Sequence, residues 1–183
     1  LTRWGFYMFT VKQSGTLTIY ISPDPPGFFD NGDYNFALFD VSNGCGSLGN
    51  ALRCSNSYNS SDPAQDIGLN MSSTDTTEGA GGDGWLKYIN VQCGHTYLLC
   101  LDIPNNDGNG FSLSFGGTAL FGAPQTAFTA SPASVCTNQP VTFTLDTSAC
   151  FVSNPFITYT WDFGPNATPS TYTGATPPTV TFS

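Results

Sequence analysis

The sequence has few charged residues and very few basic ones. Charged side chains make up 9% of the 183 residues, and the four Lys and Arg residues are Arg3, Lys12, Arg53 and Lys87. They stand against 13 acidic residues, which gives a formal net charge of −9. A basic surface is therefore missing, and this argues against nucleic acid or anionic lipid as a partner.

Long apolar runs are missing as well. No run reaches about 18 residues, so the sequence predicts no membrane-spanning helix and no membrane insertion. The chain starts at Leu1 within what reads as the approach to a strand, and the sequence itself contains no signal-peptide pattern. We therefore expect a mature or excised piece of a longer protein.

Residues that commonly build catalytic centres are scarce. His95 is the only histidine, it lies in a predicted turn, and no G-x-S-x-G nucleophile motif occurs. Glu78 is the only glutamate, and most Asp residues stand in turn sequences, so no carboxylate pair is placed for glycoside hydrolysis. We predict a non-catalytic protein and interpret His95 as a solvated turn residue.

Aromatic and alternating sequences are plentiful and predict an all-β protein. Aromatic residues make up 14% of the chain. The runs 86–91, 97–102 and 111–115 alternate in side-chain direction, which predicts an antiparallel meander with Gln92–His95 as a hairpin connection. The strand at 4–11 is apolar on both faces, so we expect it to be central in its sheet or covered on both sides.

A domain boundary is predicted at residues 122–125, where a Gly-Ala-Pro-Gln segment follows a complete set of strands. This gives a first domain at residues 1–122 and a second, sandwich-like domain at 126–183. The second domain is shorter than the roughly 100 residues of an Ig-like sandwich. Three explanations stay open: the rest of the domain lies elsewhere in a longer protein, a strand from another chain completes it, or it is complete.

Two stretches resemble known families. The run from Glu78 to Ala119 contains GAGGDG, then G-x-T-Y-x-L-x-x-D, then G-F-x-L-x-F-x-G-T-A. It resembles the jelly-roll domains of large secreted Bacteroidota proteins, which are similar to pre-peptidase C-terminal and CUB-like modules. Trp161-Asp162-Phe163-Gly164 resembles the core strand of a polycystic-kidney-disease (PKD) domain. The resemblance implies a jelly-roll β-sandwich followed by an incomplete PKD/Ig-like β-sandwich, in a protein exported by the type IX secretion pathway.

The even number of cysteines suggests an oxidising, extracellular compartment. We interpret all six as disulfide residues with a structural role, and Cys136 and Cys150 are expected to pair within the second domain. The six are Cys45, Cys54, Cys93, Cys100, Cys136 and Cys150.

The pairing in the first domain stays open. Four cysteines allow three connectivities, and the family resemblance favours Cys45 with Cys54, which leaves Cys93 with Cys100. A straight strand would separate Cys93 and Cys100 by roughly 20 Å, against a limit of about 7 Å for a disulfide. Cys54 with Cys100 and Cys45 with Cys93 is therefore the alternative.

Calcium is the candidate cofactor, because loops of the first domain offer hard oxygen ligands. CUB-like jelly rolls, which this domain resembles, can hold Ca²⁺ at an Asp-rich end. No EF-hand spacing occurs, and ordinary turns explain the same residues. The candidate ligands are Asp30, Asp33, Asp102, Asn106 and Asp107.

The sequence predicts a structural and adhesive module of a large extracellular or cell-surface protein, whose partners are other domains or copies of the same protein. A more specific form of this prediction is that copies of the chain assemble into a fibre by strand complementation. The alternative is a carbohydrate-binding accessory module of a secreted protease or glycosidase, for which Phe28, Phe29 and Tyr58 are candidate sugar contacts. An aromatic platform flanked by acids would favour that alternative.

Thr76 is a candidate for O-linked glycosylation, since Asp75-Thr76-Thr77 resembles the Bacteroidota sites.

Overall fold

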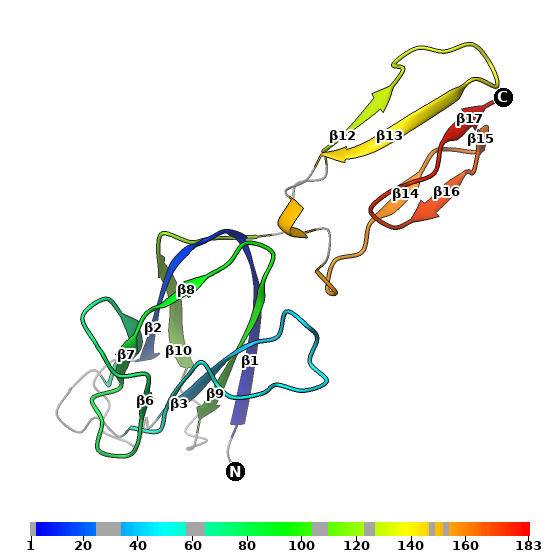
Figure 1. Ribbon diagram of the computed structural model, residues 1–183. Coiled ribbons are helices and arrows are strands. Elements are labelled where there is room, and N and C mark those ends of the chain that lie inside the picture. The colour runs from blue at the N-terminus through cyan, green and yellow to red at the C-terminus, as the bar shows by residue number, and fades with distance from the viewer. Residues whose placement is uncertain are drawn as a thin grey trace. The chain divides into compact units, whose positions relative to one another are not determined.

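The computed structural model describes residues 3–24, 34–57, 65–103, 110–122, 127–146, 149–151 and 154–183 (Figure 1). The all-β prediction is confirmed, since the regular structure of these described residues consists of strands and one short 3-10 helix, η1 (Ala149–Phe151). None of the described helical structure is long and apolar enough to cross a membrane. The chain forms two compact units, residues 1–122 and 123–183, which we call the N-terminal and C-terminal units.

Two sheets make up the N-terminal unit, and we call them sheet I and sheet II. In spatial order, sheet I contains β11 (Leu120–Phe121), β1 (Arg3–Gln13), β9 (Thr96–Ile103), β3 (Asn35–Asp40), β4 (Arg53–Ser55) and β6 (Thr77–Glu78). Sheet II contains β10 (Gly110–Gly117), β2 (Gly15–Asp24), β5 (Ile67–Asn70) and β7 (Trp85–Lys87), and β8 (Ile89–Val91) also pairs with β2.

The core lies between the inner faces of these two sheets. Leu17, Ile19 and Ile21 of β2 are at most 1% exposed, and Leu99 and Leu101 of β9 are fully buried. Successive side chains of a strand point to opposite faces, so every second residue of each strand enters the core. In the sequence, Leu17, Ile19 and Ile21 alternate with Thr16, Thr18 and Tyr20, which predicts an inward face. Their burial confirms this prediction.

Consecutive strands between residues 89 and 117 alternate between the sheets, which corrects the predicted meander. β8 pairs with β2, β9 pairs with β1 and β3, and β10 returns to β2. Residues 92–95 therefore connect two sheets and do not form a hairpin. Alternation along the sequence fixes which side chains share a face of the strand, but it contains no information about which strand is the neighbour.

Arg53 links the two sheets at one side of the core. From β4 in sheet I, its guanidinium donates hydrogen bonds to the carbonyl oxygens of Lys87 at 2.6 Å and Tyr88 at 2.9 Å. Partial burial lowers the pKa of Arg53 from its ordinary value. The guanidinium N–H groups of Arg53 thus provide hydrogen bonds for two carbonyl groups at the place where the regular strand pairing of β7 ends.

The C-terminal unit places one sheet opposite a pair of strands (Figure 1). The sheet contains, in spatial order, β12 (Ala127–Ser131), β13 (Pro140–Asp146), β17 (Val180–Phe182) and β15 (Ala167–Thr168). The pair is β14 (Thr160–Asp162) with β16 (Thr171–Thr173). Trp161 anchors this unit: it is 8% exposed, and its indole N–H donates to the carbonyl of Gly174 at 2.9 Å.

Candidate functional site

The outer face of sheet I carries a row of exposed apolar side chains on β1. Trp4, Phe6 and Met8 are exposed to 58%, 64% and 55%, and the rings of Trp4 and Phe6 stack with centroids 6.4 Å apart. We call these three residues the outer row. The sequence predicts that β1 is central or covered on both sides. It does lie between β11 and β9, but coverage of both faces is wrong, because the outer row is exposed. A strand that is apolar on both faces has the same sequence pattern whether its own fold or a partner covers the second face.

The same strand has a free edge beside the outer row. β9 pairs with β1 from Arg3 to Thr10, whereas β11 meets the other side at Val11 and Gln13. Within the described ranges, no strand pairs with that other side between Arg3 and Phe9. A free edge presents backbone N–H and C=O groups that can pair with a strand of another chain. The outer row and the free edge together form an apolar surface suited to strand addition.

An aromatic pair lies on the outer face of sheet II. The rings of Tyr20 on β2 and Trp85 on β7 have centroids 5.6 Å apart, at an interplanar angle of 36°. They line a hollow of about 360 Å³ together with other residues that include Asn70 and Met71. The Tyr20 hydroxyl donates a hydrogen bond to the carboxylate of Asp66. We call Tyr20 and Trp85 the aromatic platform; an acid beside such a platform is the feature expected of a carbohydrate site.

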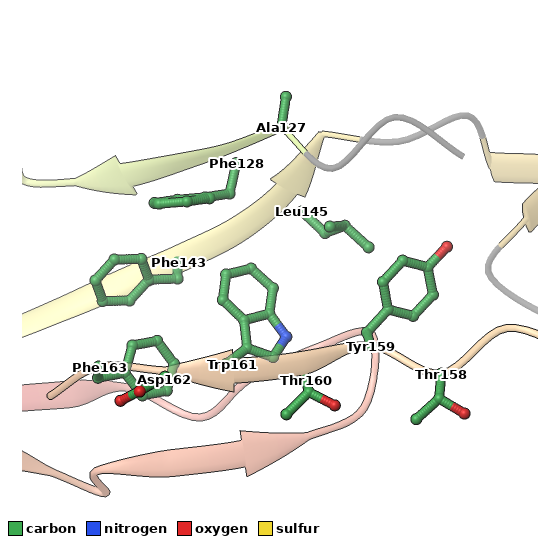
Figure 2. A pocket seen from close by; sticks show the side chains of 10 residues that line it. All are labelled: Ala127, Phe128, Phe143, Leu145, Thr158, Tyr159, Thr160, Trp161, Asp162 and Phe163. Atoms are coloured by element: carbon green, nitrogen blue, oxygen red, sulfur yellow. The ribbon is translucent and has the colours of Figure 1, made fainter. Parts of the chain in front are cut away.

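The C-terminal unit contains an open groove between the β12–β13 pair and β14 (Figure 2). It has a volume of about 380 Å³, and aromatic rings dominate its walls. Phe128 is 59% exposed, with its ring centroid 5.7 Å from that of Trp161. We call this the aromatic groove; it is lined by Ala127, Phe128, Phe143, Leu145, Thr158, Tyr159, Thr160, Trp161, Asp162 and Phe163.

Two polar features adjoin the aromatic groove. Tyr159 is 8% exposed, and its hydroxyl oxygen is buried without a hydrogen-bond partner among the described residues. Because this oxygen is already buried, a ligand in the open groove does not reach it, and its missing bond is a local free-energy cost of the fold. In addition, β14 pairs with β16 on one side, and no described strand pairs with its other side.

His95 belongs to a hydrogen-bonded cluster with Asp40 and Ser42. Its Nδ1 lies 2.8 Å from Asp40 Oδ2, and Asp40 Oδ1 accepts bonds from the backbone N–H, at 2.9 Å, and the hydroxyl of Ser42. Burial acts to raise the pKa of Asp40, but the bonds from Ser42 and His95 outweigh it and lower the pKa below its ordinary value. Serine and imidazole both bind the carboxylate, so the imidazole is not placed to take the serine proton, as nucleophile activation requires. The cluster ties the end of β3 to the turn before β9.

Glu78 organises the Gly-rich loop that follows β6. Its Oε2 accepts the backbone N–H of Gly84 at 3.0 Å, and its Oε1 accepts that of Asp83 at 3.2 Å. Partial burial, followed by the proximity of Asp83, raises the pKa of Glu78. A Cβ atom on Gly82 would lie 2.5 Å from the Glu78 carboxyl carbon, so the loop closes around this side chain.

The expected disulfide pairings are not formed. Cys93 and Cys150 are disulfide-bonded. The other four are free thiols: Cys45 and Cys136 are exposed, Cys54 is half-buried and Cys100 is buried. The pairings of Cys45 with Cys54, of Cys93 with Cys100 and of Cys136 with Cys150 are therefore corrected.

Strand positions explain why the alternative pairing of Cys54 with Cys100 also fails. Ala37 of β3 pairs with Cys54 of β4 on one side and with Cys100 of β9 on the other. The two cysteines are thus two strand spacings apart, about 9.5 Å, which exceeds the reach of a disulfide. Burial raises the pKa of the Cys100 thiol. Spacing in the sequence could not reveal that a third strand lies between them.

Of the proposed calcium ligands, the structure describes Asp102, and it lies on β9 opposite Asn35 of β3. One side-chain oxygen of each, Asp102 Oδ1 and Asn35 Oδ1, is buried without a hydrogen-bond partner among the described residues. No metal-binding cluster of three or more His, Cys, Asp or Glu residues occurs within these ranges. The remaining candidates, Asp30, Asp33, Asn106 and Asp107, lie outside the described residues.

The candidate sugar contacts Phe28, Phe29 and Tyr58 also lie outside the described residues. Thr76, the candidate glycosylation site, is exposed in the segment before β6 and is therefore accessible to a modifying enzyme. Sequence reasoning missed the outer row, the aromatic platform and the aromatic groove, because exposed and buried aromatics look alike in an alternating strand.

Comparison with protein-family models, with curated proteins and with solved structures finds no match to this chain.

Proposed function

We propose that this chain is a non-catalytic structural and adhesive module of an extracellular protein, and that it binds through β1. The outer row beside a free strand edge is the observation that supports this role. An apolar row costs solubility in water unless a partner covers it. The disulfide-bonded cysteines agree with an oxidising, extracellular compartment. The family resemblance, including export by the type IX pathway, stays a prediction and is compatible with this role.

Adsorption to an apolar surface tests this proposal. The intact chain and a Phe6→Ser variant would be passed over an alkane-coated biosensor surface, with Met71→Ser as the matched control. Met71 is also exposed, to 60%, but it belongs to the hollow on sheet II. We expect Phe6→Ser to reduce adsorption at least about tenfold, which corresponds to roughly 1.4 kcal/mol. Equal adsorption of all three proteins would refute the assignment of the adhesive face to β1.

Carbohydrate binding is the second candidate, and the aromatic platform favours it. Sugar rings stack on aromatic faces, while hydroxyl, amide and carboxylate groups bind their hydroxyls. Tyr20 is 43% exposed, and its hydroxyl group is oriented by Asp66. A glycan array probed with the intact chain and with Tyr20→Ala tests this. Binding that disappears in the variant supports a sugar site, and an array without any binding rejects it.

Calcium binding remains a proposal that the unpartnered oxygens of Asp102 and Asn35 support. Both residues lie at the end of sheet I from which the predicted ligand loops extend. A cation in this place would satisfy both oxygens. Adding CaCl₂ to chelator-treated protein should raise the melting temperature, and Asp102→Asn should reduce that shift. Identical melting temperatures with chelator and with calcium would reject the site.

A further inference from the structure

The aromatic groove has the form of a sandwich core that lacks one covering strand. Phe128, Phe143 and Trp161 face one another across it, yet Phe128 remains 59% exposed. The unpaired side of β14 borders the groove. A strand that paired with β14 would cover the exposed aromatic rings.

The outer row has the spacing that such a strand needs. Its three side chains occur at every second residue of β1, so neighbours are about 6.6 Å apart along the strand. Tyr159, Trp161 and Phe163 also occur at every second residue. Trp161 belongs to β14, the other two lie next to its ends, and all three line the groove. Side by side in one sheet, β1 and β14 would place both sets on the same face, under Phe128 and Leu145.

The charges of the two surfaces are complementary. β1 holds two of the four basic residues of the chain, Arg3 and Lys12, and no acidic residue. The C-terminal unit has no Lys, Arg or His, and its two acidic residues are Asp146 and Asp162. Asp162 lines the groove, and Asp146 pairs with Ala127, which also lines it. Because each copy carries a net charge of −9, this local attraction would guide copies that otherwise repel each other.

We infer that β1 of one copy adds to the free edge of β14 in a second copy and inserts its outer row into the aromatic groove. The inference rests on the proposed adhesive role of β1 and names its partner. The contact is heterologous, because the two surfaces are different, and every copy would have one of each. Repeated contacts of this kind generate open filaments unless the rotation between copies closes a ring.

The test is a complementation experiment with the intact chain. Phe6→Asp disables the donor strand, and Phe128→Asp disables the groove. Met71→Asp places the same charge on a similarly exposed apolar residue, which follows β5 and lines the hollow on sheet II. Oligomers would be measured by sedimentation velocity and inspected by electron microscopy. Because Phe128 contacts Trp161, a second groove variant, Asp162→Lys, reverses an exposed charge and leaves the aromatic packing intact.

We expect the unmodified chain and Met71→Asp to form concentration-dependent linear or ring-shaped oligomers. Phe6→Asp and Phe128→Asp should each weaken the contact by at least about 30-fold, as loss of a central interface residue does, and Asp162→Lys should weaken it less. A mixture of Phe6→Asp and Phe128→Asp should form one-to-one dimers, since each variant keeps one intact surface.

Three outcomes would overturn the inference: an unmodified chain that stays monomeric, a variant mixture that stays monomeric while the unmodified chain assembles, or a Met71→Asp variant that fails to assemble. The adsorption assay separates this failure from failure of the proposed function. A monomeric chain whose adsorption depends on Phe6 would retain the adhesive role and exclude self-assembly, whereas loss of both would reject both.

Discussion

The two faces of β1 can be tested with one pair of substitutions in sheet I, Phe6→Thr and Leu101→Ala. Phe6 is paired with Cys100, the residue before Leu101, so the two positions are close in the sheet but lie on opposite faces. Leu101 is fully buried, and truncation of a buried Leu to Ala costs about 2–5 kcal/mol. For Leu101→Ala we expect the free energy of unfolding to fall by about 3–4 kcal/mol, because the closely packed neighbouring side chains cannot move far enough to fill the cavity.

The expected loss of unfolding free energy in Phe6→Thr is much smaller than that in Leu101→Ala. Phe6 is 64% exposed, so about a third of its surface is withdrawn from water in the folded chain. With roughly 200 Å² for a phenyl side chain and ~25 cal/mol per Å², this is at most about 1.8 kcal/mol. Residual burial in the unfolded chain reduces the value to about 1 kcal/mol, and threonine keeps the preference for a strand.

Hydrogen exchange of the β9 amides measures both costs. It reports the opening of the N-terminal unit separately from that of the C-terminal unit. The protein would be diluted until sedimentation shows only monomer, since assembly would add apparent stability. A Phe6→Thr cost equal to that of Leu101→Ala would refute the conclusion that the outer face of β1 is exposed.

Three further substitutions test the packing of the N-terminal unit. Asp40→Asn should lower the free energy of unfolding by about 1 kcal/mol at pH 7. Because the pKa of Asp40 is lowered in the folded protein, the difference between the two proteins should disappear as the pH falls from about 4 through that lower pKa. A difference in unfolding free energy that does not depend on pH would contradict this. Arg53→Met should lower the free energy of unfolding, measured by urea denaturation, by about 2 kcal/mol, because it leaves two carbonyl groups without a hydrogen bond. Lys87→Met should change this free energy little. Similar losses for both variants would argue against the link between the sheets. Gly68→Ala should lower the free energy of unfolding by about 3 kcal/mol, because Gly68 has a φ of 147° and a Cβ atom there would lie 2.0 Å from the Ile19 carbonyl oxygen. A melting temperature like that of the unmodified chain would refute this geometry.

The sequence by itself determined the class of fold and much of the core. The alternation of Leu17, Ile19 and Ile21 predicts an inward face, and these residues are buried. This succeeds because a strand places every second side chain on one face, whatever its neighbours are. The oxidising compartment stays a prediction, and the disulfide-bonded cysteines are compatible with it.

The tertiary structure decided everything that depends on which strands are neighbours. Cys54 and Cys100 look like candidates for a disulfide until Ala37 is seen between them. Residues 92–95 look like a hairpin until β8 and β9 are found in different sheets. Trp4, Phe6 and Met8 look like core residues, but they lie at an edge where no described strand covers them. A period of two fixes the direction of each side chain, whereas covering and pairing arise from contacts between residues far apart in the sequence.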